Sequence, residues 1–470
     1  MSRLTKLEEE VLEKIKPKPH EYKIVLEAYE ILRNELDRVL RRYGVEGEIT
    51  LQGSIAHDTW LAGDRDIDIF VLYPENWSRG DLEDKGFNII LEAARIIGNY
   101  ETRYAEHPYV RVKVGEVLAD IVPALKIRDP RSIKTAVDRT PFHTMYVNSK
   151  LNSELRDHVR LLKKFMKGIG VYGAEIKTRG FSGYVAELLV ITYGGFREVL
   201  EAASTWKQNV FINSLGPRLT EDFKELLKSR YPDSCIYLPD PVDPLRNVTA
   251  SVSLKSLFTF ILASKCYLKN SSEVFFEERV EANKEALIRS LENRCIVFIE
   301  YYLEKELPPD VLWGEAWRTA HTLSKIIKQL DVNLIDYSAW TNERDVIVIA
   351  IELDHCQLSG FKLFTGPCIG DSDERLYRFI VKHIGRGLGP WIDQKGCLDS
   401  LDPRKELSIA SVLGNKWMDY TVSSHLRVVK PVIEYATAYT VNKLIEIGAN
   451  KWLQGFVLKT PNWMEKCISS

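Results

Sequence analysis

The spacing of apolar and polar positions predicts a mixed α+β chain that opens with helices. From residue 2 to 43, apolar side chains recur at three- and four-residue steps among charged ones, which is typical of amphipathic helices. Strand-like patterns then occur at Glu48–Leu51, Tyr109–Val114 and Val117–Pro123. Residues 152–199 return to a helical pattern, and residues 345–353 are strongly strand-like. Beyond this, the second half supports only a mixed α+β prediction.

The segment GDRDIDIF, residues 63–70, places acids inside a strand pattern. Side chains alternate between the two faces of a strand, so Asp66 and Asp68 share one face while Ile67 and Ile69 share the other. A carboxylate in such a place is costly unless a cation meets it. Two adjacent carboxylates stay ionised together when a divalent cation binds both, and hard oxygen ligands suit Mg²⁺. The segment therefore suggests a magnesium site, although most Asp-x-Asp pairs are turn, cap or surface residues.

Two further features strengthen this interpretation. Asp120 is the acid in the predicted strand at 117–123 and supplies a third carboxylate. Gly53-Ser54 forms a turn before a short helix predicted at Ile55–Leu61, and unpaired N–H groups at a helix start attract phosphate. Together these features predict a metal site beside a phosphate-binding turn.

A basic stripe follows in the helical region after the acidic segment. Its members fall at three- and four-residue steps and are Arg156, Arg160, Lys163, Lys164 and Lys167. Such a stripe is most often a solvated helix face, but its position after the acidic site favours a role facing phosphate groups equally well. The pattern alone leaves both alternatives open.

Composition places the chain among intracellular globular proteins. Its 470 residues are enough for roughly three domains, and 45% of them are hydrophobic. Lys and Arg number 64 against 66 Asp and Glu, a formal net charge of −2, so nucleic-acid contacts must come from local basic patches. The 7 cysteines are scattered without paired metal-ligand spacing, which suits a reducing cytosol. A charged amino terminus without an apolar signal core, and no long uncharged stretch, predict a soluble, cytoplasmic protein without membrane contact.

The acids and the Gly-Ser turn resemble the signature of the polymerase-β-like nucleotidyltransferase superfamily. Five runs are similar, more narrowly, to the archaeal-type (class I) CCA-adding enzymes: RYAEHPY (103–109), SIKTAVDRTPFH (132–143), VRLLKKF (159–165), VYGAEIKTRGFSGYVAELL (171–189) and DPVDPLRNV (240–248). The resemblance is dense from residue 53 to 252 and sparse afterwards. It implies a CCA tRNA nucleotidyltransferase that adds C, C and A to tRNA 3′ ends from CTP and ATP, without a nucleic-acid template, and releases pyrophosphate.

The resemblance also implies the catalytic residues. Asp66 and Asp68 would bind both of two Mg²⁺ ions, and Asp120 the ion that activates the RNA 3′-hydroxyl. Gly53 and Ser54, with the adjacent backbone N–H groups, would hold the triphosphate. The proposed chemistry therefore agrees with the metal site inferred from the residues.

Nucleotide contacts carry over in the same way. The residues that match triphosphate and sugar contacts of the family are His143, Lys163 and Tyr172. Arg246, with Asp240 nearby, corresponds to the arginine that helps to read the edge of the incoming base. His57 is a departure, because the family usually has Arg there and a neutral or partly charged His is a weaker phosphate partner. Outside the motifs, His143, Tyr172 and Arg246 would be interpreted as a packed histidine, a core aromatic residue and a surface cation.

The family architecture implies four parts. These are a catalytic head with a small mixed sheet at 1–150, a helical neck for base recognition at 151–255, an α/β body at 256–390 and a tail at 391–470. Body and tail are expected to bind the acceptor stem and T arm of tRNA by shape and phosphates, and a homodimer is the family expectation. Aromatic and basic tail residues without an assigned contact are Trp417, His425, Arg427, Lys430 and Trp452.

Three other functions share part of this signature. A poly(A) or oligoadenylate polymerase shares the three acids and the Gly-Ser turn, but not the runs after Asp120. A nucleotide-sugar glycosyltransferase uses an Asp-x-Asp metal site, but its chemistry explains neither the Gly-Ser turn nor Asp120. A catalytically inactive RNA-binding protein could keep the fold, but the presence of all three acids disfavours it.

Overall fold

The computed structural model describes residues 4–104, 108–135, 137–278 and 283–468. It confirms the predicted α+β class and divides the chain into two compact units: unit 1 is Met1–Arg279 with Pro461–Ser470, and unit 2 is Val280–Thr460. Parts of two sequence runs, residues 105–107 and Ala136, lie outside the described residues. Within the described ranges, no helix combines the length and the apolar composition that crossing a bilayer requires.

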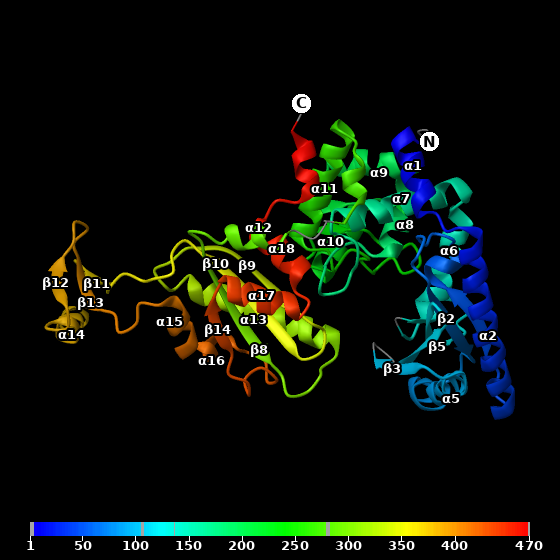
Figure 1. Ribbon diagram of the computed structural model, residues 1–470, viewed down its shortest axis with the longest axis horizontal. Helices are drawn as coiled ribbons and strands as arrows, with labels where there is room; N and C mark the ends of the chain where they lie inside the picture. The colour runs from blue at the N-terminus through cyan, green and yellow to red at the C-terminus, as the bar shows by residue number, and fades with distance from the viewer. Residues whose placement is uncertain (1–3, 105–107, 136, 279–282, 469–470) are drawn as a thin grey trace. The chain divides into compact units, whose positions relative to one another are not determined.

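Unit 1 contains a five-stranded sheet with the order β1-β2-β5-β4-β3. Its strands are β1 (Glu48–Gln52), β2 (Asp66–Tyr73), β3 (Tyr100–Tyr104), β4 (Pro108–Val114) and β5 (Val117–Leu125). β2 and β5 run parallel, whereas the other neighbouring strands are antiparallel. One face packs its branched apolar residues on α2 (Pro19–Tyr43) and α5 (Phe87–Ile97), drawn in blue in Figure 1. The opposite face carries Asp66 and Asp68, as the alternation predicted.

The rest of unit 1 is mainly helical. Its helices are α1 (Lys6–Ile15), α4 (Arg79–Asp81), α6 (Thr140–Lys150), α7 (Ser153–Gly168), α8 (Gly183–Tyr193), α9 (Phe196–Ser204), α10 (Glu221–Arg230) and α11 (Leu254–Lys269), with the short strands β6 (Val210–Phe211) and β7 (Ile236–Tyr237). Aromatic rings from α7, α9 and α11, including Phe165, Phe196 and Tyr267, form a second core. A 3₁₀-helix at Asn462–Cys467 packs on α11, so chain segments from both ends of the sequence build this unit.

The short helix after the Gly-Ser turn differs from the prediction. α3 spans Gly53–Ala56 rather than Ile55–Leu61. Asp58 has a left-handed φ of 53°, and the carbonyl groups of residues 58–60 bind side chains of α7 instead of extending the helix. The prediction was wrong because tertiary hydrogen bonds replace helical ones here.

Unit 2 contains a four-stranded antiparallel sheet with the order β14-β8-β10-β9. Its strands are β8 (Cys295–Tyr302), β9 (Leu334–Thr341), β10 (Val346–Leu353) and β14 (Val432–Tyr435). Helix α13 (Pro309–Ile327) covers one face, and α17 (Ala438–Glu446) and α18 (Asn450–Leu458) cover the other. All eight residues of β10 are buried because both faces are covered, which explains its almost continuous apolar sequence. The exception is Glu352, whose carboxylate accepts hydrogen bonds from Arg294.

A second, three-stranded sheet in unit 2 carries α14 (Asp373–His383) and is drawn in orange in Figure 1. Its order is β11 (Phe361–Cys368), β13 (Cys397–Pro403), β12 (Leu388–Ile392), and the remaining helices of the unit are α12 (Lys284–Arg289), α15 (Ile409–Asn415) and α16 (Trp417–Tyr420). The predicted boundary at 390 runs through this sheet, and β14 of the predicted tail pairs with β8 of the predicted body. The four-part division therefore stays a prediction, with body and tail largely joined in unit 2.

Two of the tail residues singled out from the sequence have partners inside unit 2. The indole N–H of Trp452 donates to Ser338 Oγ at 2.8 Å, and its ring packs beside Trp340. His425 Nδ1 lies 2.6 Å from a carboxylate oxygen of Glu315. These contacts support the unit itself, so neither residue is assigned to tRNA.

Six of the seven cysteines form disulfides. The pairs are Cys266–Cys467, Cys295–Cys356 and Cys368–Cys397, and Cys235 is a buried free thiol. The partners are 29 to 201 positions apart, so tertiary contacts, not sequence spacing, bring them together. The inference of a reducing environment from scattered cysteines therefore does not hold for these pairs.

Candidate active site

The three predicted acids lie on two neighbouring strands. β2 and β5 are parallel, and their register sets Asp68 opposite Asp120, while Asp66 precedes Asp68 by two residues on the same face. Ile67 and Ile69 are 1% and 0% exposed and belong to the core beneath the sheet. The pleat therefore sends all three carboxylates to one face.

Gly53 brings the predicted phosphate-binding turn against Asp68. Its φ is 68°, and a Cβ at this position would lie 2.1 Å from Asp68 Oδ2. Gln52, immediately before it, is opposite Asp68 in the pairing of β1 with β2. Glycine is required here because it allows both the left-handed backbone and the close approach. The turn that carries Ser54 thus begins beside the carboxylates.

Arg111, on β4, binds the third acid. Its Nε and Nη2 donate to Oδ1 and Oδ2 of Asp120, each at 2.6 Å, and these bonds raise the pKa of Arg111. For Asp68 the balance is different: burial, with repulsion from Asp120 and Asp66, raises its pKa to about 6. Burial also raises the pKa of Asp66. The charge of Asp120 is compensated by Arg111, whereas Asp66 and Asp68 repel each other.

The donor set fits a divalent cation, although it is not a preformed cage. Among the described residues, no three acidic, histidine or cysteine side chains converge closely enough to hold a metal ion. Asp120 is engaged by Arg111 at 2.6 Å, and Asp66 and Asp68 repel each other on one face. Neighbouring carboxylates of this kind are ligands that Mg²⁺ prefers. Asp66 and Asp68 can therefore hold such an ion, and Asp120 can join them once it leaves Arg111.

Two buried cations of α7 hold the segment that follows α3. Arg160 donates from Nε to Trp60 O at 3.1 Å and from Nη2 to Asp58 O at 2.6 Å. Lys163 Nζ donates to the carbonyl between them, Thr59 O, at 3.2 Å. Arg160 and Lys163 are 1% and 2% exposed. Arg160 is therefore neither solvated nor accessible to RNA, and both interpretations of the basic stripe are wrong for this residue.

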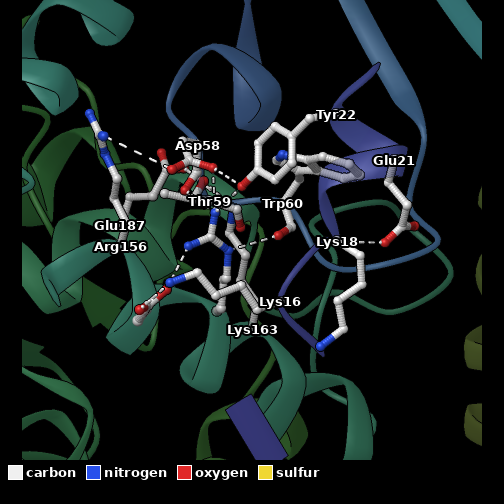
Figure 2. A network of polar contacts seen from close by, with 12 residues as sticks. Lys16, Lys18, Glu21, Tyr22, Asp58, Thr59, Trp60, Arg156, Lys163 and Glu187 are labelled. Atoms are coloured by element: carbon white, nitrogen blue, oxygen red, sulfur yellow. Dashed lines mark hydrogen bonds and ion pairs between the residues drawn. The ribbon is translucent and has the colours of Figure 1, made fainter. Parts of the chain in front are cut away.

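Glu187, on α8, joins His57 to Lys163. His57 Nδ1 lies 3.0 Å from both carboxylate oxygens, and Lys163 Nζ lies 3.3 Å from Oε1. Figure 2 draws Glu187, Thr59 and Lys163 in one polar network; the Thr59 hydroxyl donates to Glu187 Oε1 at 2.5 Å. Burial would raise the pKa of Glu187, but Lys163 and His57 lower it to about 2. Two of the predicted nucleotide-binding residues are thus bound to one buried carboxylate.

Tyr172 lies in the segment between α7 and α8, and its hydroxyl approaches the first residue of α8 near Lys163. A Cβ at Gly183, the first residue of α8, would be 3.0 Å from the Tyr172 hydroxyl oxygen and 3.6 Å from Lys163 Nζ. Burial raises the pKa of Tyr172, so its hydroxyl remains a donor at neutral pH. The structure therefore brings these two predicted residues together.

A second group forms around Asp240, which is 0% exposed. Its carboxylate is 2.8 Å from His143 Nε2 and accepts hydrogen bonds from the Tyr184 hydroxyl and Arg246 Nη1, each at 3.0 Å. The rings of His143 and Tyr184 stack with centroids 4.1 Å apart. Burial would raise the pKa of Asp240, but His143 and Arg246 lower it to about 2. His143, Asp240 and Arg246 are thus brought together, and the Asp240 oxygens face these donors.

The sequence analysis missed Arg111, Tyr184 and Glu187. Glu187 was detectable, because it is the acid in the apolar run VAELLV, the same signal that identified Asp66. Arg111 lies in the strand YVRVKV, but its pairing with Asp120 depends on the register between β4 and β5, which cannot be deduced from the sequence. Tyr184 has no signal apart from its motif.

Two family models match this chain. Residues 32–143 match the family model described as nucleotidyltransferase domain, and residues 157–277 match that described as tRNA nucleotidyltransferase, second domain. A solved structure of the Cid1 poly(U) polymerase with Mg and 3′-dATP bound has a TM-score of 0.45 and 18% identity, and the match covers 58% of this chain and 98% of that one.

Relatives match along nearly the full chain. The CCA-adding enzyme of Sulfurisphaera tokodaii is 39% identical over 463 residues, which cover 98% of this chain and 100% of the relative. The CCA-adding enzyme of Saccharolobus shibatae is 36% identical over 466 residues, with 98% and 100% covered. The resemblance found in the sequence motifs and the predicted nucleotidyltransferase class are therefore confirmed. This chain belongs to the family of CCA-adding enzymes.

Proposed function

We propose that this protein adds C, C and A in turn to the 3′ end of tRNA from CTP and ATP, without a nucleic-acid template and with release of pyrophosphate. Its membership of a nucleotidyltransferase family supports the reaction class. The observation that supports the proposed site best is the register that sets Asp68 opposite Asp120 beside the Gly53 turn. Phosphoryl transfer needs little covalent help, so positioning and charge are what such a site must supply.

Asp66 and Asp68 are the proposed ligands of two Mg²⁺ ions, with Asp120 joining them. When bound, such ions lower the pKa of the RNA 3′-hydroxyl and neutralise the leaving pyrophosphate. Burial and repulsion among the acids raise the pKa of Asp68 to about 6, which supports a cation site because a cation would remove that repulsion. Asp120 also accepts two hydrogen bonds from Arg111, so Arg111 competes with the ion for this third carboxylate.

The proposed triphosphate and sugar contacts are Gly53, Ser54, His57, Lys163 and Tyr172. His57 has both ring nitrogens engaged, Nδ1 with Glu187 and Nε2 with Thr144 Oγ1 at 3.0 Å. A direct phosphate contact from His57 therefore requires the exchange of one of these bonds. The Lys163 ammonium is likewise turned inward, so its contact with phosphate needs a similar exchange.

The proposed base-side group consists of His143, Asp240 and Arg246. Arg246 is the member that reads the base edge, because its guanidinium is partly exposed and offers a fork of donors. Asp240 is buried and already accepts bonds from its neighbours, so its part is to orient Arg246 and His143.

The proposal extends to the partner and the compartment. Unit 2 is the candidate surface for the acceptor stem and T arm, since double-stranded RNA is recognised mainly through shape and phosphates. We also propose a cytoplasmic homodimer. The disulfides do not exclude that location, because disulfides also occur in some intracellular proteins.

The test is nucleotide incorporation with Mg²⁺ on tRNA transcripts that end before CCA, after C and after CC. Each transcript is offered CTP, ATP, UTP or GTP separately. Incorporation of C into the first two and of A only into the third supports the proposal. Repeated addition of A to any 3′ end would make the protein a poly(A)-type polymerase, and tRNA binding without addition would make it an inactive binding protein.

Asp68→Ala tests the catalytic site directly. We expect it to abolish nucleotide addition, with tRNA binding retained and the thermal midpoint unchanged or raised, because the ionised carboxylate is disfavoured in the fold. Asp64→Ala is the matched control. Asp64 lies on the loop just before β2, but its carboxylate forms an ion pair with Lys167 of α7 at 2.5 Å. A substantially active Asp68→Ala enzyme would refute the metal-ligand role.

A further inference from the structure

Glu187 is the acid at the centre of a buried group that includes the segment behind the Gly-Ser turn. It is 2% exposed and accepts hydrogen bonds from His57, Thr59 and Lys163. A carboxylate only accepts, so the proton in its contact with His57 is on Nδ1. The carboxylate therefore selects the tautomer of His57 as well as its orientation.

Lys163 depends on the same carboxylate for its charge. Its three ammonium protons are used within the protein, on Thr59 O at 3.2 Å, Thr59 Oγ1 at 2.8 Å and Glu187 Oε1 at 3.3 Å. Burial lowers the pKa of Lys163, whereas Glu187 opposes this effect. Lys163 therefore needs the Glu187 carboxylate beside it to keep a positive charge at this depth.

Two short paths connect Glu187 to the turn. The backbone N–H of His57 donates to Gly53 O at 3.1 Å, and the backbone N–H of Thr59 donates to Ser54 O at 2.9 Å. Glu187 binds the side chains of both His57 and Thr59. If Glu187 is replaced, His57 can move and shift Gly53 O, and Thr59 can move and shift Ser54 O.

We propose that Glu187 is a positioning residue for triphosphate binding: it holds the Gly53-Ser54 turn against the β2 acids and fixes His57 and Lys163. This inference rests on the proposed function, in which the turn binds the triphosphate. Because the triphosphate is common to CTP and ATP, the loss of Glu187 weakens the binding of both nucleotides by the same factor. Base choice, which belongs to the Asp240 group, is unchanged.

The experiment compares Glu187→Gln with the wild-type enzyme on tRNA that ends before CCA and on tRNA that ends after CC. We expect KM for CTP on the first and for ATP on the second to rise by one common factor of about 10. The discrimination against UTP and GTP and the KM for tRNA remain as in the wild type. Thermal unfolding identifies a temperature at which each variant is folded.

Two further variants keep the test decisive. Thr59→Val removes one hydroxyl from the group without leaving a charge unpaired, and we expect a smaller rise of KM, again equal for CTP and ATP. Glu8→Gln is the matched control, because Glu8 is a buried acid of the same unit that binds Arg197 and Tyr267 instead. It should alter thermal stability without changing KM for either nucleotide.

The outcomes separate this inference from the proposed function. If the wild-type enzyme adds no nucleotide to tRNA, the proposed function fails before Glu187 is in question. If the wild type is active but folded Glu187→Gln and Thr59→Val keep KM within about twofold of it, the positioning role is refuted. Unequal effects on CTP and ATP would also refute it, because they would place Glu187 with the base-side group.

Discussion

Arg111 and Asp120 face each other on neighbouring antiparallel strands, with both guanidinium contacts at 2.6 Å. Asp120 is also the register partner of Asp68 on the other side. Asp120 therefore lies between Arg111 on one side and Asp68, a carboxylate of the proposed metal site, on the other. The proposed third ligand, Asp120, and the cation that competes for it, Arg111, thus lie in the same sheet.

Arg111→Gln should lower the Mg²⁺ concentration needed for half-maximal activity, because Asp120 no longer has to leave a cation. The expected change is about two- to fivefold, equivalent to the 0.5–1 kcal/mol that a partly exposed ion pair contributes. Initial rates across a Mg²⁺ titration measure it, with Lys113→Gln on the same strand as the control. An unchanged or higher Mg²⁺ requirement would show that Arg111 assists the acids instead of competing with the ion.

Asp240→Asn should remove a pH-dependent contribution to stability. Burial opposes ionisation, but His143 and Arg246 lower the pKa of Asp240 from 3.8 to about 2. A carboxylate whose pKa is lowered by folding stabilises the fold at pH values above its pKa in the unfolded state. This contribution is lost as the pH falls to its pKa in the folded state. The free energy of unfolding of the wild type should therefore exceed that of the variant by about 2 kcal/mol above pH 4 and by less than about 0.5 kcal/mol at pH 2. Thermal midpoints from pH 2 to 6 measure the difference; a constant difference over this range would contradict the prediction.

Arg160→Met should be strongly destabilising. The variant leaves the carbonyls of Asp58 and Trp60 without their buried donor. Asp157 loses one of its two cationic partners and keeps Lys16. We expect the free energy of unfolding to fall by about 2–4 kcal/mol, because two carbonyl groups lose their donor at this buried position. Lys164→Met, one position beyond Lys163 in the same helix but partly exposed, should change it by about 0.5 kcal/mol or less. Equal stability of the two variants in denaturant titrations would refute the buried role of Arg160.

Alkylation of the denatured, unreduced protein should label one cysteine, Cys235, and reduction should expose all seven.

Cys467→Ser should lower the stability of unit 1 by about 2–5 kcal/mol, because Cys266–Cys467 closes the longest covalent loop of the three pairs. Mass spectrometry counts the labels, and thermal unfolding with and without reductant measures the loss. Three or more labels without reduction would show that at least one pair is open.

The pair of strand acids could be found in the sequence because the pattern is local. Asp66 and Asp68 are two residues apart, so strand alternation alone puts them on one face, and Ile67 and Ile69 on the other. The acid of the apolar run VAELLV carried the same kind of signal, and an equal search for buried acids would have found Glu187. The boundaries of α3 could not be read, because its end is set by hydrogen bonds from α7.

By itself, the sequence determined the α+β class, the strand that carries two acids and the family. These features depend on periodicity and contiguous motifs, which involve only residues close together along the chain. Tertiary structure alone decided which groups meet. Asp120 lies between Asp68 and Arg111 because of strand register, Arg160 is buried because a distant segment covers it, and Cys266 reaches Cys467 across 201 positions. The physical reason is that charge compensation and burial depend on distances in space, which a chain sets only when its packed elements bring remote residues together.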